Sequence, residues 1–219
     1  SITRDLLKAA YKQSMPISMS KEIIYPAIDV ENFNSTGYRK WNDKPHFLTV
    51  SRLHWKKGLE YTLQALALLD FDFRYTIIGE GADYERLVFA AYQLGIADKV
   101  SFAGKKAQDE VKTAMQNQDV YIQYSLQEGF CNSVLEAQAS GMLCLVSDAE
   151  GLTENVLDGE TGWVIEKRKV LLLAERIAQT VALPNFIKDK ISKQSAQRAV
   201  KEFNIKKQKV QFESFYNHE

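Results

Sequence analysis

The chain has 219 residues, and its 28 basic and 28 acidic side chains give a formal net charge of zero at pH 7. A balanced charge argues against a protein that binds nucleic acid by neutralising its phosphates, and 45% hydrophobic residues suffice for the core of one large domain. No apolar run approaches the roughly 20 residues of a membrane span. The two cysteines, Cys131 and Cys144, lie on successive elements of an α/β pattern, which favours free thiols in a reducing cytoplasm over a disulfide framework.

Apolar runs of strand length alternate with helical periodicity along most of the chain. A helix over 1–11 and a strand over 22–25 are predicted first, and the polar, turn-rich stretch 34–44 is predicted to be an exposed connector. Six strands follow, over 46–50, 73–78, 100–103, 119–124, 143–146 and 163–165. Helices are predicted between them over 57–69, 83–94, 108–117 and 131–141, and three more between Leu171 and Phe215, separated near Pro184 and Asn204. Strands that alternate with helices predict right-handed crossovers, so the expected fold is an α/β, Rossmann-like doubly wound parallel sheet with C-terminal helices.

The loop between the fourth strand and the following helix is the most informative stretch. It leads from the carboxyl end of a strand into a helix N-terminus, where parallel sheets bind ligands and free N–H groups attract anions. Two carboxylates bracket this position, Glu128 on the loop and Glu136 about two turns into the helix. Glu128 could instead cap the helix, and Glu136 could be a solvated helix residue, although the apolar neighbours of Glu136 indicate a buried helix. The pair suits a phosphorylated ligand with hydroxyl groups at both ends.

A basic loop follows the first strand. Arg52 and Lys57 could both reach a diphosphate, Arg52 through its planar fork and Lys57 as a point charge, whereas the alternative is a solvated basic loop. His54 in the same loop is predicted to be held by hydrogen bonds without a chemical role. The turn from Gly79 to Gly81 resembles a shortened phosphate loop and does not match the dinucleotide-binding pattern. No group of Cys and His has zinc spacing, so no metal site is predicted.

These stretches occur in a fixed order over 45–176, and the sequence there resembles the C-terminal, donor-binding domain of retaining glycosyltransferases with the GT-B fold, in glycosyltransferase family four. Residues 50–58 look like the family's Gly-Arg-Leu-x-x-x-Lys-Gly loop, and residues 79–81 look like its Gly-x-Gly turn. Residues 100–104 and 158–162 resemble its Val-x-Phe-x-Gly and Asp-Gly-x-Thr-Gly motifs, and Glu128 and Glu136 form its Glu-x7-Glu motif. Ser51, Tyr124 and Cys131 depart from the usual glycine, proline and glycine, and the last two leave the donor sugar open.

The resemblance implies a nucleoside-diphosphate sugar as the donor substrate, without a metal or other cofactor, because Arg, Lys and a helix dipole neutralise the leaving group. It implies catalytic positions at Arg52 and Lys57, which would hold the diphosphate, and at Glu128, which would contact the sugar. Glu136 would bind the ribose. The nucleobase, the phosphates and the sugar would meet the further positions Gly79, Gly81, Lys105, Gly129, Phe130, Cys131, Asn132, Ser133 and Val134.

The resemblance also implies a division of the chain. Residues 1–44 would be the tail of an N-terminal acceptor-binding domain and a linker, 45–183 the nucleotide-sugar-binding domain, and 184–219 helices that cross back to the other domain. Part of that contact would come from Phe203, Val210, Phe212 and Phe215. The glycine-rich loop and active-site histidine of the N-terminal domain have no counterpart, so we expect a fragment that binds the sugar donor and transfers little or nothing.

The reaction expected of the whole enzyme is transfer of a hexose, with retention, to a glycan or lipid-linked acceptor held by the N-terminal domain. The expected location is the cytoplasm, with peripheral contact at the inner face of the membrane left open. Two alternatives stand beside this one. A nucleotide-sugar 2-epimerase should add acid/base carboxylates and a histidine to the cleft, a set that the sequence does not reveal, and a non-catalytic nucleotide-sugar-binding module would not need the basic and acidic residues named above.

Overall fold

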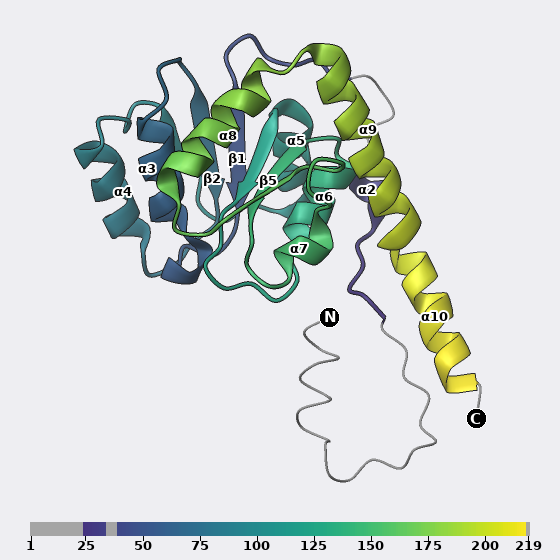
Figure 1. The fold of residues 1–219 in the computed structure, drawn as a ribbon. Coiled ribbons are helices and arrows are strands. Elements are labelled where there is room, and N and C mark those ends of the chain that lie inside the picture. The colour runs from purple at the N-terminus through teal and green to yellow at the C-terminus, as the bar shows by residue number, and fades with distance from the viewer. Residues whose placement is uncertain (1–23, 34–38, 218–219) are drawn as a thin grey trace.

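The computed structural model describes residues 24–33 and 39–217. Its centre is one parallel sheet in the order β3-β2-β1-β4-β5-β6 (Figure 1). The strands are β1 (His46–Val50), β2 (Arg74–Ile78), β3 (Val100–Phe102), β4 (Val120–Gln123), β5 (Leu143–Ser147) and β6 (Trp163–Ile165). All six expected strands are confirmed, with ends that differ from the predicted ranges by no more than one residue.

Helices cover both faces of the sheet. One face packs against α3 (Leu59–Ala67), α4 (Tyr84–Gln93) and α8 (Val170–Ala182). The other packs against α2 (Val30–Phe33), α5 (Gln108–Asn117), α6 (Asn132–Ala139), α7 (Leu152–Asn155) and α9 (Asn185–Glu202). Neighbouring strand residues such as Phe47 and Leu48 are both fully buried, one in each core, because successive side chains point to opposite faces. The doubly wound α/β fold is therefore confirmed.

The strand order reverses between β1 and β4. The chain proceeds from β1 through β2 to β3 on one side, and from β4 through β5 to β6 on the other. A crevice opens at such a switch point, beyond the carboxyl ends of the strands. The loops that leave β1 and β4 carry Arg52, Lys57 and Glu128, so the fold brings these three residues to the same crevice.

The helix predicted over 57–69 begins later than expected, so the prediction is wrong at the start of the range. Residues Trp55–Lys57 form a short 3₁₀ turn, η1, and Gly58 adopts a left-handed conformation (φ 62°) before α3 begins. A Cβ atom at position 58 would lie 2.0 Å from the carbonyl oxygen of Tyr124. The close approach of two loops, which only glycine permits, therefore interrupts the helix.

The described part of the predicted exposed connector, residues 39–44, is anchored to the domain instead. Arg39 donates hydrogen bonds to the carbonyl oxygens of Met115 and Ser140, both at 2.7 Å, and to that of Gln118. These carbonyls end α5 and α6, where helix geometry leaves them without intrahelical partners. Burial lowers the pKa of Arg39 to about 10, yet the side chain stays a cation at neutral pH. The Trp41 indole N–H is also held, 2.8 Å from Asp189 Oδ1.

The N-terminal predictions are only partly testable. The helix over 1–11 lies outside the described residues, as do the first two residues of the strand over 22–25. Ile24 and Tyr25 have no regular secondary structure, so the strand is wrong there. Backbone pairing occurs instead at Ile28, whose N–H donates to Phe203 O at 2.9 Å and whose carbonyl accepts from Ile205 N at 3.0 Å.

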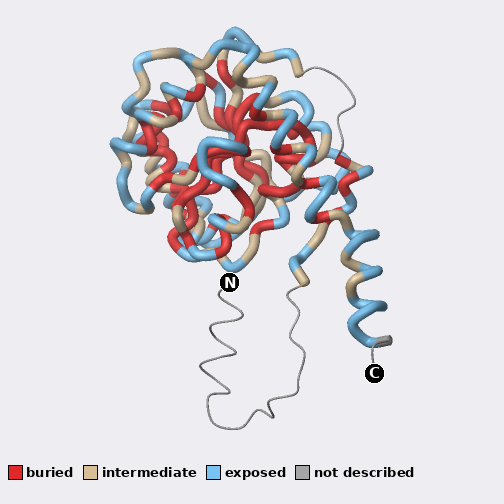
Figure 2. The backbone as a smooth tube through the Cα atoms, turned by 45° about the vertical axis from the view of Figure 1, so that its right-hand side comes forward, coloured by how far each residue is buried: buried red, intermediate tan, exposed pale blue. Residues whose placement is uncertain are grey.

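Three C-terminal helices are present with the expected breaks near Pro184 and Asn204. Helix α9 packs against α6 and β5, and α10 (Ile205–Asn217) extends away from the body of the domain (Figures 1 and 2). Phe203 is buried within the domain, unlike the expected exposed contact, whereas Val210 is 62% exposed. Among the described helices none could cross a membrane alone, and α8 and α9 meet the length and composition of a span only as a pair bent by 108°.

Candidate functional site

The loop after β1 has a fixed conformation. His54 Nδ1 accepts a hydrogen bond from Lys56 N at 3.3 Å, and Lys57 N donates to His54 O at 2.8 Å. The prediction of a hydrogen-bonded loop histidine is thereby confirmed. Leu53 is buried beneath the loop. This geometry directs Lys57 toward β4, where it meets the next loop.

Lys57 and Glu128 form the central contact of the site. Lys57 Nζ lies 2.5 Å from Glu128 Oε2, and the two side chains are only 17% and 12% exposed. Ser125 Oγ donates a second hydrogen bond to the same oxygen at 3.2 Å. A carboxylate that is so little exposed is stable here because a cation and a hydroxyl group both pair with it. Glu128 therefore does not cap the following helix, which was the alternative left open by the sequence.

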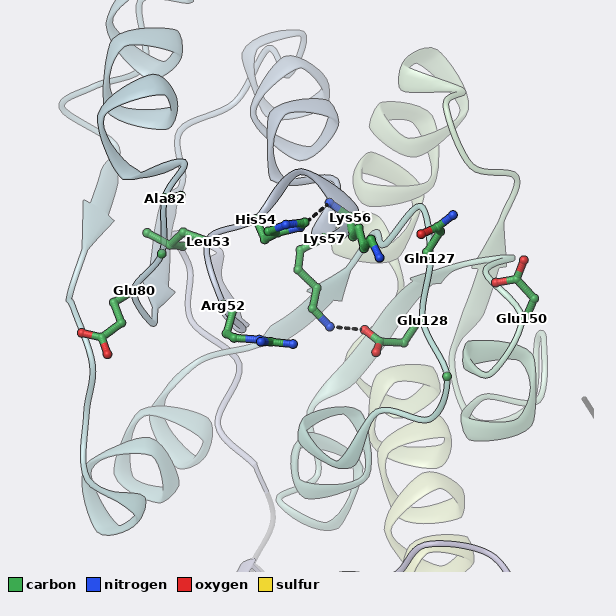
Figure 3. Close-up of a pocket in the computed structure, with 12 residues that line it drawn as sticks. Arg52, Leu53, His54, Lys56, Lys57, Glu80, Ala82, Gln127, Glu128 and Glu150 are labelled. Carbon is green, nitrogen blue, oxygen red and sulfur yellow. Dashed lines mark hydrogen bonds and ion pairs between the residues drawn. The ribbon is translucent and has the colours of Figure 1, made fainter. Parts of the chain in front are cut away.

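A cleft of about 660 Å³ opens around this pair (Figure 3). It brings together five of the residues predicted for the site: Arg52, Lys57, Gly81, Glu128 and Gly129. The guanidinium of Arg52 points toward the Lys57–Glu128 pair, and within the described ranges it forms no ion pair. One cation in the cleft is thus engaged and another is free to meet an anion.

Helix α6 begins at the edge of the same crevice. Asn132 is exposed and Ser133 half-buried, whereas the N–H of Val134 donates to Cys131 O at 3.2 Å. The backbone before them is held by a hydrogen bond from Cys131 N to Asn155 Oδ1 at 3.1 Å. In the part of the chain that the structure describes, no side chain caps the helix at Cys131.

Several predicted side chains point into the protein rather than toward the cleft. Cys131 and Val134 are buried in the core, and both cysteines are free thiols, as expected. Phe130 packs on Phe203 with 5.7 Å between ring centroids, so only its backbone can face a ligand. Burial raises the pKa of the Cys131 thiol, and the charge of Glu128 adds to this shift.

Two further predicted positions also lie outside the lining of the cleft. Gly79 packs against the β1 loop, and a Cβ atom there would lie 1.9 Å from Ser51 O, so this glycine joins two loops. Lys105 is exposed on the loop that follows β3. The structure therefore places both beside the crevice without bringing them to the Lys57–Glu128 pair.

Glu136 is the carboxylate of α6. It is half-buried, and desolvation raises its pKa above the ordinary value. Among the described residues it has no hydrogen-bond or ion-pair partner. Glu136 is therefore not the solvated helix glutamate that was the alternative. A partly desolvated carboxylate without a partner is stabilised by a ligand that donates hydrogen bonds.

Tyr124, where the family usually has proline, serves the fold. Its hydroxyl bonds to the carbonyl oxygen of Glu166 and accepts from Lys169 N at 3.0 Å, which fixes the loop after β6. The side chain is 1% exposed, and burial raises its pKa to about 12. The Tyr124 side chain therefore points away from the cleft.

Several residues of the cleft were not predicted from the sequence. Glu80 and Glu150 add carboxylates to its lining, and His54 lies there too, so the cleft holds acid/base groups that had not been identified. Gly151 was also missed, although a Cβ atom at that position would lie 1.0 Å from Gly129 O. The sequence did offer one signal for Gly151, since it is a glycine in the loop after β5, a strand next to β4.

Comparison with known proteins identifies the family. The family model described as "Glycosyl transferases group 1" matches residues 31–199, more than half of the chain. The chain belongs to this family. The putative colanic acid biosynthesis glycosyltransferase WcaL of Salmonella typhimurium is 25% identical over 186 residues, which are 81% of this chain and 46% of that protein. A Campylobacter jejuni N,N'-diacetylbacillosaminyl-diphospho-undecaprenol alpha-1,3-N-acetylgalactosaminyltransferase is 30% identical over 62% of this chain and 35% of its own length.

Solved structures show the same fold in other glycosyltransferases. A Rickettsia africae glycosyltransferase matches with a TM-score of 0.86 at 18% identity, over 98% of this chain and 61% of that one. Anabaena HepE, solved in complex with UDP and glucose, matches with a TM-score of 0.81 at 19% identity, over 90% of this chain and 57% of that one. The fold is thus that of one Rossmann-like half of a GT-B glycosyltransferase, and this glycosyltransferase chain spans less than half the length of the two curated relatives named above.

Proposed function

We propose that this glycosyltransferase chain is the donor-binding half of a retaining enzyme that transfers a hexose from a nucleoside-diphosphate sugar to a glycan or lipid-linked acceptor. The observation that carries the proposal is the cleft at the switch point between β1 and β4, where Arg52, which has no ion-pair partner among the described residues, lies beside the Lys57–Glu128 pair. The solved complexes of HepE contain UDP, and the names of relatives include colanic acid biosynthesis and an undecaprenol-linked acceptor. These names support the substrate class.

Each part of the ligand has a partner of suitable chemistry. Arg52 and Lys57 neutralise the diphosphate, together with the N-terminal N–H groups of α6, so a resident metal is not required. The carboxylate of Glu128 accepts hydrogen bonds from sugar hydroxyls, and Glu136 accepts them from the ribose. Charge that develops on the departing nucleoside diphosphate meets fixed cations in a partly desolvated cleft, where their effect is larger than in water.

Transfer itself requires more than donor binding. The acceptor hydroxyl must be held against the reacting carbon of the sugar, and such positioning supplies several kcal/mol of rate enhancement. We assign acceptor binding to an N-terminal domain, with 1–44 as its tail and linker and 184–219 as helices that contact it. This chain alone should then bind the nucleotide-sugar and hydrolyse it slowly at most. The full enzyme would act in the cytoplasm, at the membrane where its acceptor is lipid-linked.

Calorimetry with UDP, GDP and ADP in the presence of EDTA tests the proposal. One of these nucleotides should bind without metal, and Lys57→Ala should weaken binding about tenfold, because hydrogen bonds to charged groups contribute roughly 1.5–3 kcal/mol. Glu128→Gln should selectively weaken the matching nucleotide-sugar relative to the nucleoside diphosphate. Strict dependence on magnesium, or equal affinity of the Lys57 variant, would contradict the assignment.

The additional acid/base groups of the cleft favour one second candidate. His54, Glu80 and Glu150 line the cleft with Glu128, and a nucleotide-sugar 2-epimerase needs a set of this kind. However, His54 Nδ1 is already occupied by Lys56 N, and Glu150 lies 3.7 Å from Lys167 Nζ. Incubation with UDP-N-acetylglucosamine followed by separation of the C2 epimers decides between the two, since only the epimerase forms UDP-N-acetylmannosamine.

A further inference from the structure

Buried polar side chains line one side of β4 and its exit. Tyr121, Gln123 and Ser125 occupy alternate positions, so they project to the same face, and each is 0% exposed. Strands in the centre of a parallel sheet are normally apolar on both faces, because helices cover them. Three polar residues in this position need partners, and their partners lead to the cleft.

The three side chains form a continuous series of hydrogen bonds that ends at Glu128. Ser125 Oγ donates to Glu128 Oε2 at 3.2 Å, and Gln123 Nε2 donates to Ser125 Oγ at 2.8 Å. The Tyr121 hydroxyl lies 3.1 Å from Gln123 Oε1 and 2.8 Å from Ser133 Oγ, at the start of α6. The Tyr121 hydroxyl has one proton and three acceptors within reach, Gln123 Oε1, Ser133 Oγ and the carbonyl oxygen of Val50 at 3.1 Å, whereas Ser133 Oγ donates to the same carbonyl at 3.2 Å.

The end of the series at Glu128 suits an ionised carboxylate. Gln123 Nε2 donates to Ser125 Oγ and Ser125 Oγ donates to Glu128, and hydrogen bonds aligned in this way strengthen one another in a low-dielectric interior. The far end is fixed to the backbone, since Val50 N donates to the Tyr121 hydroxyl at 3.3 Å. Lys57 reaches Glu128 from the loop after β1, whereas Ser125 reaches it from the buried segment just after β4.

We propose that Ser125 and Gln123 are positioning residues that orient the Glu128 carboxylate toward the sugar of a bound nucleotide-sugar. The inference rests on the proposed function, in which Glu128 contacts the sugar and not the nucleotide. Neither residue reaches the cleft itself, and both act through Glu128. Their loss should therefore change the preference for a sugar-bearing ligand while leaving the nucleotide contacts in place.

The test compares two affinities in each variant of the 219-residue chain. The probes are UDP, GDP and ADP, each paired with UDP-glucose, GDP-mannose or ADP-glucose, measured by calorimetry. Ser125→Ala should weaken the nucleotide-sugar about fivefold to tenfold and the nucleoside diphosphate less than about twofold, given the strength of a hydrogen bond to a charged group. Gln123→Met, which breaks the next hydrogen bond, should change the same ratio in the same direction, and urea unfolding identifies the variants that remain folded.

Ser147→Ala is the matched control. Ser147 is an equally buried serine on β5, and its hydroxyl donates to the backbone oxygen of Ser125 rather than to Glu128. A second comparison combines variants: in a Glu128→Gln background, Ser125→Ala should have no further effect on the ratio of affinities. If nucleotides bind and Ser125→Ala leaves the ratio of the two affinities unchanged, the positioning role is overturned while the proposed function stands. If no nucleotide binds the native chain, the proposed function fails, and the inference fails with it.

Discussion

Replacement of Lys57 by methionine isolates the cost of an unpaired carboxylate in the cleft. Methionine retains most of the aliphatic length of lysine and removes the charge that faces Glu128 at 2.5 Å. Removal of one partner from a fully buried pair costs about 3–5 kcal/mol. Here the side chains are 17% and 12% exposed and Ser125 still donates to Glu128, so we expect about 2 kcal/mol.

Urea unfolding at pH 7 measures this loss. With a slope near 2 kcal/mol per M, the midpoint of Lys57→Met should fall by about 1 M with the slope unchanged. Lys56→Met is the control, because Lys56 lies on the same loop, is exposed, and places its ammonium over the Trp55 ring, 5.7 Å from the centroid, rather than against a carboxylate of the described residues. Its midpoint should change little.

The double variant Lys57→Met/Glu128→Gln distinguishes a lost pair from lost packing. Neutral glutamine no longer needs a cation, so the double variant should recover at least half of the stability that Lys57→Met loses. A Lys57→Met midpoint equal to that of Lys56→Met would refute the reasoning. So would a double variant as unstable as the sum of its two single variants.

Three other outcomes follow from the same structure. Glu136→Gln should weaken nucleoside diphosphates and nucleotide-sugars alike, by calorimetry. Burial raises the pKa of Glu136, so the protonated form is favoured in the folded state. The contribution of Glu136 to stability is therefore complete below the ordinary carboxylate pKa and declines as pH rises through the raised pKa. Glu136→Gln should accordingly be more stable than the native chain in urea at pH 7 and not at pH 4. Gly151→Ala should abolish nucleotide binding, as measured by calorimetry, since its Cβ would lie 1.0 Å from Gly129 O and would displace the loop that lines the cleft. Cys131 and Cys144 are free and buried, and burial raises the pKa of both thiols, so neither should react with Ellman's reagent until the chain is unfolded, when both should react.

The sequence predicted the sheet well because its signals are local. Each strand is a short apolar run between turn residues, and the alternation of strands with helices permits only one class of fold. The same logic brought Arg52, Lys57 and Glu128 together, because residues at the carboxyl ends of neighbouring parallel strands share one edge.

The features that the sequence did not predict depend on contacts between distant segments. Gly151 is required by the position of Gly129, and Arg39 is buried by the ends of two helices far along the chain. The orientation of Phe130 depends on Phe203, which follows more than seventy residues later. None of these partners can be identified from periodicity, since periodicity describes one element at a time.

The anchoring of Arg39 has a mechanical consequence. Its guanidinium holds the carboxyl-terminal carbonyl of α6 at Ser140, and the opposite end of α6 presents Asn132 and Ser133 to the cleft. Helix α6 has 8 residues and its hydrogen bonds run along its axis, so a displacement of one end along the axis also moves the other. A displacement of Arg39 would therefore move the carboxyl-terminal end of α6, and with it the opposite end, to which the proposed function assigns the phosphates.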